Sequence, residues 1–395
     1  MASVPGALGE RPADDYGPGN LSAPTVIVSG MIAATPGQGG AAWAVLQYLL
    51  GLRRLGCDVH FVEPIAAGTV PEASARYAAG AMERFGLGGR WALLPEGGGD
   101  PVGLSRPALR ELARRADLLL SVSGMLTDPD VLEAIPVRAY LDLDPVFNQL
   151  WHAVEGVDMR FDAHTHFVSV ADAIGAPGSP VPDCGRDWIP TLPPVVLEEW
   201  PFAPRLERRA LTTVGHWRSY GSIHHEGVHY GQKAHALRPL LDLPRRTRAR
   251  FELALAIHPG EARDLAALER GGWTILDPAE VAFTPGDYRR FVQGSWAELG
   301  VAKLGYVAAG CGWFSDRSAC YLASGRPVIA QDTGFTRRLP QGAGLFAFAG
   351  ADDVVGAIEE LERDYRAHRV AARELAREHL GSDRVLGSLL ERLLG

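Results

Sequence analysis

Cysteine, long apolar runs and positive charge are all scarce in this 395-residue sequence. The four cysteines form no C-x-x-C pair, which argues against a zinc site and against a disulfide framework. No apolar run approaches the roughly 20 residues that span a bilayer. The N-terminus also lacks the basic-then-apolar order of a signal peptide. We therefore expect a cytoplasmic protein with free thiols and no membrane span.

The scarcity of positive charge restricts the partners. The formal net charge is −8, whereas proteins that bind nucleic acids contact phosphates through concentrated positive charge. We therefore expect no nucleic-acid partner, and any anion must meet local cations. Only two of the 39 basic residues are lysines, Lys233 and Lys303, and the rest are arginines.

Hydrophobic patterning divides the chain into segments. Residues 1–22 are rich in Gly, Pro, Ala and Asp without a hydrophobic period, which predicts a disordered leader. Short apolar runs then alternate with helical patterns, which is typical of a parallel sheet covered on both faces. The predicted N-terminal domain covers 23–187, with a helix over 41–56 and strands over 25–30, 58–64, 117–124, 137–145 and 165–170.

Five prolines between positions 190 and 204 predict a linker over 188–204, because proline interrupts helices and central strands. A second α/β domain follows over 205–380, and 381–395 forms a last amphipathic helix that can pack back on the N-terminal domain. The predicted C-terminal strands are 211–217, 251–259, 273–277, 297–303, 326–332 and 345–348. The patterning thus predicts two α/β domains with parallel sheets, and if these domains face each other across a cleft, the ends of both sheets line it.

Ligands in such folds bind beyond the carboxyl ends of the strands. In the first domain this position holds the glycine-rich turn 35–42, which opens a helix and can cradle an anion or another ligand. The turn also fits a loose dinucleotide fingerprint through Gly37 and Gly39, with Glu63 as a ribose partner. A tight turn without a ligand is the simpler alternative.

The second domain carries a richer segment over 305–335. Ser315 is a predicted N-cap for a helix over 316–324, and the amides of that helix start, with the hydroxyls of Ser315 and Ser318, can hold a diphosphate. An ordinary loop whose Trp313 and Phe314 fill the core is the alternative. Upstream, Arg218 and Lys233 can neutralise a leaving diphosphate.

Asp142 and Asp144 form a D-x-D pair after an apolar run. Such a pair can hold a metal, but aspartate is common enough here for chance to explain the spacing, so we expect no metal site. Asp144, at the end of its strand, is a candidate base or acceptor contact.

The segment 323–334, ASGRPVIAQDTG, followed by LPQGAGLFAF, resembles the large retaining GT-B glycosyltransferases. The resemblance covers most of 210–380 and implies two Rossmann-like domains with parallel sheets that face each other across a cleft. It implies a nucleotide sugar on the C-terminal half and an acceptor on the N-terminal half, with the family's diphosphate-binding Arg and Lys at Arg218 and Lys233. The positions expected for the family's paired glutamates hold Trp313 and Cys320.

The leading hypothesis is a metal-independent glycosyltransferase, without a cofactor, that uses a nucleotide-diphosphate sugar such as a UDP sugar and a small, natural-product-like acceptor. The predicted catalytic residues are Asp144, Arg218 and Lys233. The predicted donor-binding residues are Gly312, Trp313, Phe314, Ser315, Ser318, Lys303, Asp332, Thr333, Gly334 and His216. The predicted acceptor-binding residues are Gln38, Gly39 and Gly40. An NAD(P)-dependent oxidoreductase, a nucleotide-sugar epimerase and a non-catalytic sugar-nucleotide binder are the alternatives.

Overall fold

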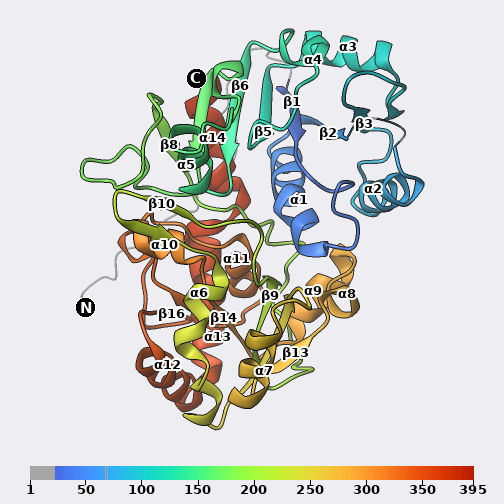
Figure 1. Ribbon diagram of the computed structural model, residues 1–395. Helices are drawn as coiled ribbons and strands as arrows, with labels where there is room; N and C mark the ends of the chain where they lie inside the picture. The colour runs from blue at the N-terminus through green and yellow to red at the C-terminus, as the bar shows by residue number, and fades with distance from the viewer. Residues whose placement is uncertain (1–22, 67, 69) are drawn as a thin grey trace, which may run out of the picture.

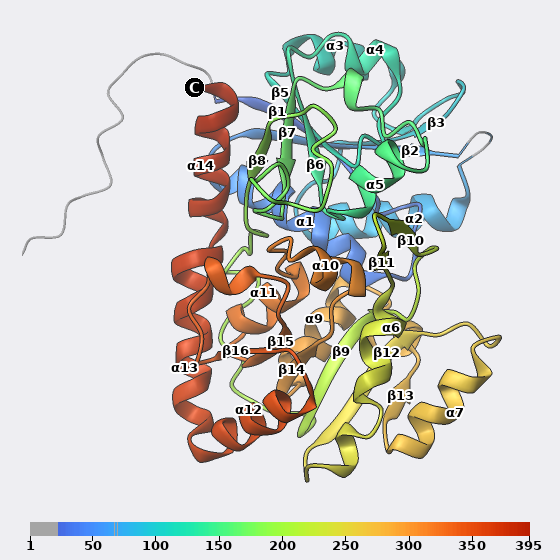
Figure 2. The same ribbon diagram turned by 60° about the vertical axis from the view of Figure 1, so that its left-hand side comes forward.

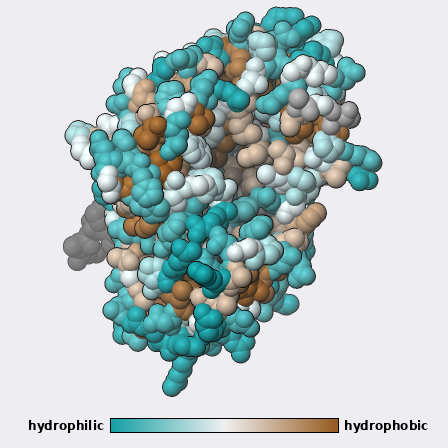
Figure 3. Space-filling model, viewed as in Figure 1, coloured by the Kyte–Doolittle hydropathy of each residue, from teal (hydrophilic) through white to brown (hydrophobic). Residues whose placement is uncertain are grey.

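The computed structural model describes residues 23–66, 68 and 70–395, so the predicted leader over 1–22 lies outside the described residues. Two α/β domains lie one above the other in Figure 1. Each contains its own sheet, and the face of the molecule in Figure 3 is hollowed. The predicted fold class of two Rossmann-like domains is confirmed.

The N-terminal sheet has eight strands in the order β4-β3-β2-β1-β5-β6-β7-β8. All neighbours are parallel except β3 and β4. Every residue of β1 is buried, because helices cover both faces of the sheet and the strand therefore reads as a continuous apolar run. The strands are β1 (Thr25–Ser29), β2 (Asp58–Ile65), β3 (Trp91–Pro95), β4 (Val102–Gly103), β5 (Leu118–Val122), β6 (Val137–Asp142), β7 (His166–Ser169) and β8 (Trp188–Pro190). The helices are α1 (Gly39–Arg54), α2 (Glu72–Arg84), α3 (Arg106–Arg115), α4 (Pro129–Leu132) and α5 (Phe147–Ala153).

The C-terminal sheet has six parallel strands in the order β13-β12-β9-β14-β15-β16. Its strands are β9 (Ala210–His216), β12 (Arg250–Ala256), β13 (Thr274–Leu276), β14 (Ala297–Gly300), β15 (Val328–Gln331) and β16 (Leu345–Phe348), and a hairpin of β10 (Ile223–His225) and β11 (Val228–Tyr230) follows β9. The helices are α6 (Lys233–Leu237), α7 (Ala262–Gly271), α8 (Pro278–Val281), α9 (Pro285–Gly294), α10 (Leu304–Ala309), α11 (Asp316–Ala323) and α12 (Ala351–Arg363).

The first residues of the predicted linker, 188–190, form strand β8 of the N-terminal sheet. β8 pairs in parallel with β7 at the edge of the N-terminal sheet, a position that tolerates Pro190 because an edge strand leaves one side unpaired. Beyond it the chain crosses to the C-terminal domain.

The last two helices run along one side of both domains (Figure 2). α13 (Tyr365–Leu375) packs on α11, whereas α14 (Ser382–Leu394) returns to the N-terminal domain and packs on α1. Gly51 permits this close approach, since a Cβ atom there would lie 2.5 Å from Leu386 Cδ1. One buried apolar cluster therefore includes residues of α1, α11 and α14.

Candidate functional site

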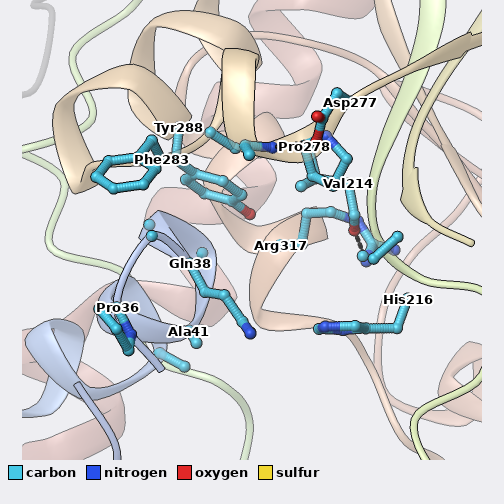
Figure 4. A pocket seen from close by; sticks show the side chains of 18 of the residues that line it. Pro36, Gln38, Ala41, Val214, His216, Asp277, Pro278, Phe283, Tyr288 and Arg317 are labelled. Atoms are coloured by element: carbon cyan, nitrogen blue, oxygen red, sulfur yellow. Dashed lines mark hydrogen bonds between the residues drawn. The ribbon is translucent and has the colours of Figure 1, made fainter. Parts of the chain in front are cut away.

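A cavity of about 450 Å³ lies between the two domains (Figures 3 and 4). One wall is the turn between β1 and α1. The opposite wall combines the carboxyl ends of β9 and β12 with the start of α11 and the segment around α8. We call this space the main cavity, and its lining residues are Pro36, Gly37, Gln38, Gly39, Gly40, Ala41, Ala44, Val214, Gly215, His216, Ala256, Asp277, Pro278, Ala279, Ala282, Phe283, Tyr288, Asp316 and Arg317.

The glycines of the β1–α1 turn are required by contact between the domains. The Gly39 amide donates to the Ala282 carbonyl at 2.8 Å, and a Cβ atom at Gly39 would lie 2.2 Å from the Thr284 carbonyl oxygen. At Gly40 a Cβ atom would approach the Tyr288 ring to 2.9 Å. Gly39 and Gly40 thus line the main cavity and also dock the N-terminal domain on the C-terminal domain.

The side chain of Glu63 closes the same turn from inside the N-terminal domain. Its carboxylate is fully buried and accepts hydrogen bonds from the amides of Ile32, Ala33 and Ala34 at 2.7–3.0 Å. Desolvation raises the pKa of this carboxyl. The Glu63 carboxylate is therefore committed to the protein backbone, which leaves it poorly placed for the ribose contact that the dinucleotide alternative requires.

Two basic side chains lie beside Gly215, a residue that lines the main cavity. A Cβ atom at Gly215 would lie 3.8 Å from Lys233 Cε and 3.9 Å from Arg317 Nη1. Arg317 Nη1 also donates to the Val214 carbonyl at 3.0 Å, as the dashed line in Figure 4 marks. Arg317 and Lys233 therefore both lie close to the backbone where β9 ends, and of these two only Arg317 is among the residues that line the main cavity.

A buried carboxylate orients Arg317. Glu298 on β14 has a fully buried side chain, and its Oε1 accepts from Arg317 Nε at 2.5 Å. Lys233 is buried too and donates to the Val301 carbonyl. Desolvation, with the neighbouring charge of Arg317, lowers the pKa of Lys233 well below its usual value. An anion in the main cavity would therefore favour the protonated form of Lys233.

His216 and Gln38 extend into the main cavity from opposite domains (Figure 4). Desolvation, together with the charges of Lys233 and Lys303, lowers the pKa of His216 below 6.5. This lowered pKa favours the neutral imidazole. Gln38 precedes α1 and supplies an amide group from the N-terminal domain.

Asp144 is placed in an ion pair between the domains instead of in the lining of the main cavity. Its carboxylate accepts from Lys303 Nζ at 2.8 and 2.9 Å, from the Tyr220 hydroxyl at 2.6 Å and from the Tyr306 hydroxyl. Lys303 also lies over the Tyr220 ring, 4.3 Å from its centroid. Asp144 and Lys303 thus join the two domains, and their predicted roles as base and donor contact stay predictions.

Arg218 contacts Glu261 and His235, and the diphosphate contact that the resemblance implies for it stays a prediction. Its Nε donates to Glu261 Oε1 at 2.5 Å, and its Nη1 lies 3.3 Å from His235 Nε2. Arg218 is not among the residues that line the main cavity. The arginine that lies beside Lys233 is Arg317, which sequence reasoning missed because arginine is common and no spacing distinguishes this one.

Ser315 is the N-cap of α11, as predicted, because its hydroxyl accepts from the Arg317 amide at 3.2 Å. Ser315 and Ser318 are both buried, and neither is among the lining residues of the main cavity. Asp316, the first residue of α11, does line it. Desolvation raises the pKa of the Asp316 carboxyl despite the neighbouring Arg317 charge. No sequence signal singled out Asp316.

The remaining predicted donor residues lie in two loops, and their donor contacts stay predictions. Asp332 Oδ1 accepts from the Gly334 amide at 2.8 Å, and the Thr333 hydroxyl donates to the Trp313 carbonyl. Gly312 has φ +83°, and a Cβ atom there would lie 1.8 Å from an Asp172 carboxylate oxygen. These residues therefore hold the loop after α10 against the N-terminal domain.

A second, smaller cavity of about 180 Å³ adjoins the main cavity. Ala44 and Asp316 line both spaces. Trp313 and Phe314, predicted as donor residues, line this second cavity instead. The full lining is Ala44, Gln47, Tyr48, Leu143, Val170, Pro193, Pro194, Trp313, Phe314 and Asp316.

Within residues 23–66, 68 and 70–395, no cluster of three or more His, Cys, Asp or Glu side chains has a geometry that could hold a metal ion. In the same part of the chain, no helix has the length and apolar character of a membrane span.

Comparisons with known proteins identify relatives by structure alone. No protein-family model matches the sequence, and no curated protein matches it in sequence. HepE from Anabaena, solved in complex with UDP and glucose, is similar with a TM-score of 0.59 and 12% identity, over 93% of this chain and 99% of that chain. An alpha-glucosyltransferase solved with UDP-glucose and DNA containing an abasic site is similar with a TM-score of 0.59 and 12% identity, over 94% and 99%. Sucrose-phosphate synthase from Thermosynechococcus elongatus has a TM-score of 0.53 and 11% identity, over 93% and 99%. Near-complete coverage of both chains at low identity shows that this protein has the two-domain GT-B fold of these glycosyltransferases.

Proposed function

We propose that this protein is a glycosyltransferase that moves a sugar from a UDP sugar to a small-molecule acceptor, without a metal ion or a bound cofactor. The fold supports this proposal, as do the UDP and UDP-glucose complexes named for the similar structures. The main cavity lies beyond the carboxyl ends of both sheets, where open α/β folds bind ligands. Its volume of about 450 Å³ falls within the range of small-molecule sites.

The observation that carries the proposal is the meeting of Arg317, Lys233 and the start of α11 beside Gly215. Breaking the bond between a sugar and a diphosphate builds negative charge on the leaving diphosphate. Fixed cations and helix amides in a partly desolvated site stabilise such charge. This arrangement can supply the electrostatic role that a divalent ion would otherwise have.

The dinucleotide alternative has less support. It needs Glu63 to bind a ribose, but three backbone amides already occupy that carboxylate. It also predicts a cofactor on the N-terminal half, whereas the basic side chains at the main cavity belong to the C-terminal domain.

Thermal-shift measurements with UDP, dTDP, GDP and NAD test the donor site. A ligand at 100 times its dissociation constant stabilises a protein by about 2.7 kcal/mol. We expect UDP to raise the melting temperature equally with magnesium and with EDTA. A shift with NAD alone, or a UDP shift that requires magnesium, would overturn the proposal.

Transfer is tested by incubating the protein with UDP-glucose and small hydroxylated compounds and detecting glycosylated products by mass spectrometry. Release of UDP only in the presence of an acceptor supports a transferase, whereas conversion of the sugar nucleotide without an acceptor supports an epimerase. UDP binding without turnover across a broad donor panel supports a non-catalytic binder. We also propose a cytoplasmic location, which cell fractionation with an antibody against the protein tests.

A further inference from the structure

The second cavity has the composition of a site for an apolar ring. Leu143, Val170, Trp313 and Phe314 provide an aliphatic and aromatic lining, with Pro193 and Pro194 from the segment that crosses between the domains. A cavity of about 150 Å³ with an apolar lining binds benzene in another protein, and this one measures about 180 Å³. It therefore has room for one ring with a small substituent and is too small for a disaccharide or a stacked nucleotide.

Three polar side chains, Gln47, Tyr48 and Asp316, interrupt this apolar lining. Gln47 already accepts a hydrogen bond from the Val196 amide at 2.8 Å. The Tyr48 side chain is 2% exposed, and its hydroxyl has no hydrogen-bond partner within the part of the chain that the structure describes. A buried hydroxyl without a partner is unfavourable for folding, so a ligand in this cavity that hydrogen-bonds to it would gain binding energy. The Asp316 carboxylate is close enough to raise the pKa of Tyr48, after the larger effect of burial.

Asp316 connects the two cavities, because it lines both of them. On the side of the main cavity it adjoins Arg317 and the region proposed for the diphosphate. On the side of the second cavity it faces the same space as Tyr48. A hydroxyl on a ring in the second cavity would therefore point toward the region proposed for the sugar.

We propose that the second cavity binds the acceptor and that the acceptor is a small, mostly apolar ring-bearing alcohol such as a phenol. This inference rests on the proposed function and adds the acceptor class to it. In the transfer step, the bond between the sugar C1 and the diphosphate oxygen breaks, and its electron pair leaves with the diphosphate. The acceptor oxygen forms the new bond to C1, and its proton passes to the Asp316 carboxylate.

An acceptor comparison tests the class. With UDP-glucose as donor, initial rates are measured for phenol, 4-methylphenol and cyclohexanol, and for glycerol, glucose and a DNA duplex as polar acceptors. We expect kcat/KM for the ring alcohols to exceed that of each polar acceptor by more than tenfold. If UDP binds and sugar is transferred faster to a polar acceptor, the inference fails while the proposed function stands. If UDP does not bind, the proposed function fails first.

Two variants test the location. Leu143→Phe fills the second cavity and leaves the lining of the main cavity unaltered. We expect it to lower kcat/KM for phenol at least tenfold while the UDP dissociation constant stays within threefold. Leu132→Phe, the same change at a half-buried position on α4, is the matched control and should change neither value by more than threefold.

Tyr48→Phe separates ligand binding from structure. Removing a buried, unpartnered hydroxyl should keep or raise the melting temperature, whereas KM for phenol should rise at least threefold because the acceptor loses a hydrogen bond. Wild-type acceptor kinetics in both Leu143→Phe and Tyr48→Phe would overturn the proposed site. A lower melting temperature with unchanged KM in Tyr48→Phe would show a packing role for the hydroxyl and would also contradict it.

Discussion

Replacement of Arg317 by glutamine tests the donor site most directly. The guanidinium is held by Glu298 and by the Val214 carbonyl beside the main cavity. A hydrogen bond to a charged group contributes about 1.5–3 kcal/mol. Since about 1.4 kcal/mol corresponds to a tenfold change in affinity, Arg317→Gln should weaken UDP binding by about 10- to 150-fold. Isothermal titration calorimetry with UDP measures this change.

Arg317→Gln also removes the partner of a fully buried carboxylate. Breaking a buried ion pair by deleting one member costs about 3–5 kcal/mol, so the single variant should unfold at lower denaturant concentration. The double variant Glu298→Gln with Arg317→Gln removes both charges and should recover most of that stability. Its UDP affinity should remain low, because the cation is still missing. A stable double variant that binds UDP as tightly as the wild type would refute the assignment.

Arg218→Gln is the matched control. The side chains of Arg218 and Glu261 are 31% and 25% exposed, and an ion pair that water still reaches contributes about 1 kcal/mol. Both UDP affinity and stability should therefore change little. A large loss of UDP affinity in Arg218→Gln would favour the role that the family resemblance implies for this residue.

Three further predictions concern charged groups. Asp144→Asn breaks the ion pair with Lys303 between the domains, so the free energy of unfolding should fall by about 1.5–3 kcal/mol. The rate of sugar transfer, measured well below the melting temperature, should stay within tenfold of the wild-type rate. A hundredfold loss of rate would instead favour the role of Asp144 as the base. Burial raises the pKa of Asp142 from 3.8 to about 6, so the folded protein is stabilised when this carboxyl is protonated. Compared with Asp142→Asn, this contribution to the free energy of unfolding should be complete below pH 3.8 and should disappear as the pH rises through about 6. In urea unfolding, the difference in free energy of unfolding between the wild type and Asp142→Asn should change by about 3 kcal/mol over this pH window. A difference that does not depend on pH would contradict this prediction. Desolvation lowers the pKa of His216, and a bound diphosphate would favour its protonated form. UDP affinity should therefore rise as the pH falls through 6.5, and His216→Gln should weaken that dependence.

Local pattern determined most of the fold. The apolar runs that begin at Thr25, Asp58 and Leu118 became the parallel strands β1, β2 and β5, because strands buried on both faces need continuous apolar sequence. Ser315 capped α11 as its position predicted. β3 was missed: its five residues, WALLP, are all buried, but so short an apolar run is ambiguous on periodicity alone.

The partners of charged side chains were decided by the tertiary structure. Asp144 ends its strand in the expected place, but its carboxylate meets Lys303, which lies 159 residues further along the chain. The sequence alone does not distinguish Arg317 from Arg218, because arginine is common in this chain. The packing of α11 against β9 and β14 places Arg317 near Lys233 and at the main cavity. Hydrophobic periodicity indicates which face of a helix or strand is buried. An ion pair between distant residues depends on which elements pack together in the tertiary structure, and short-range sequence pattern does not contain that information.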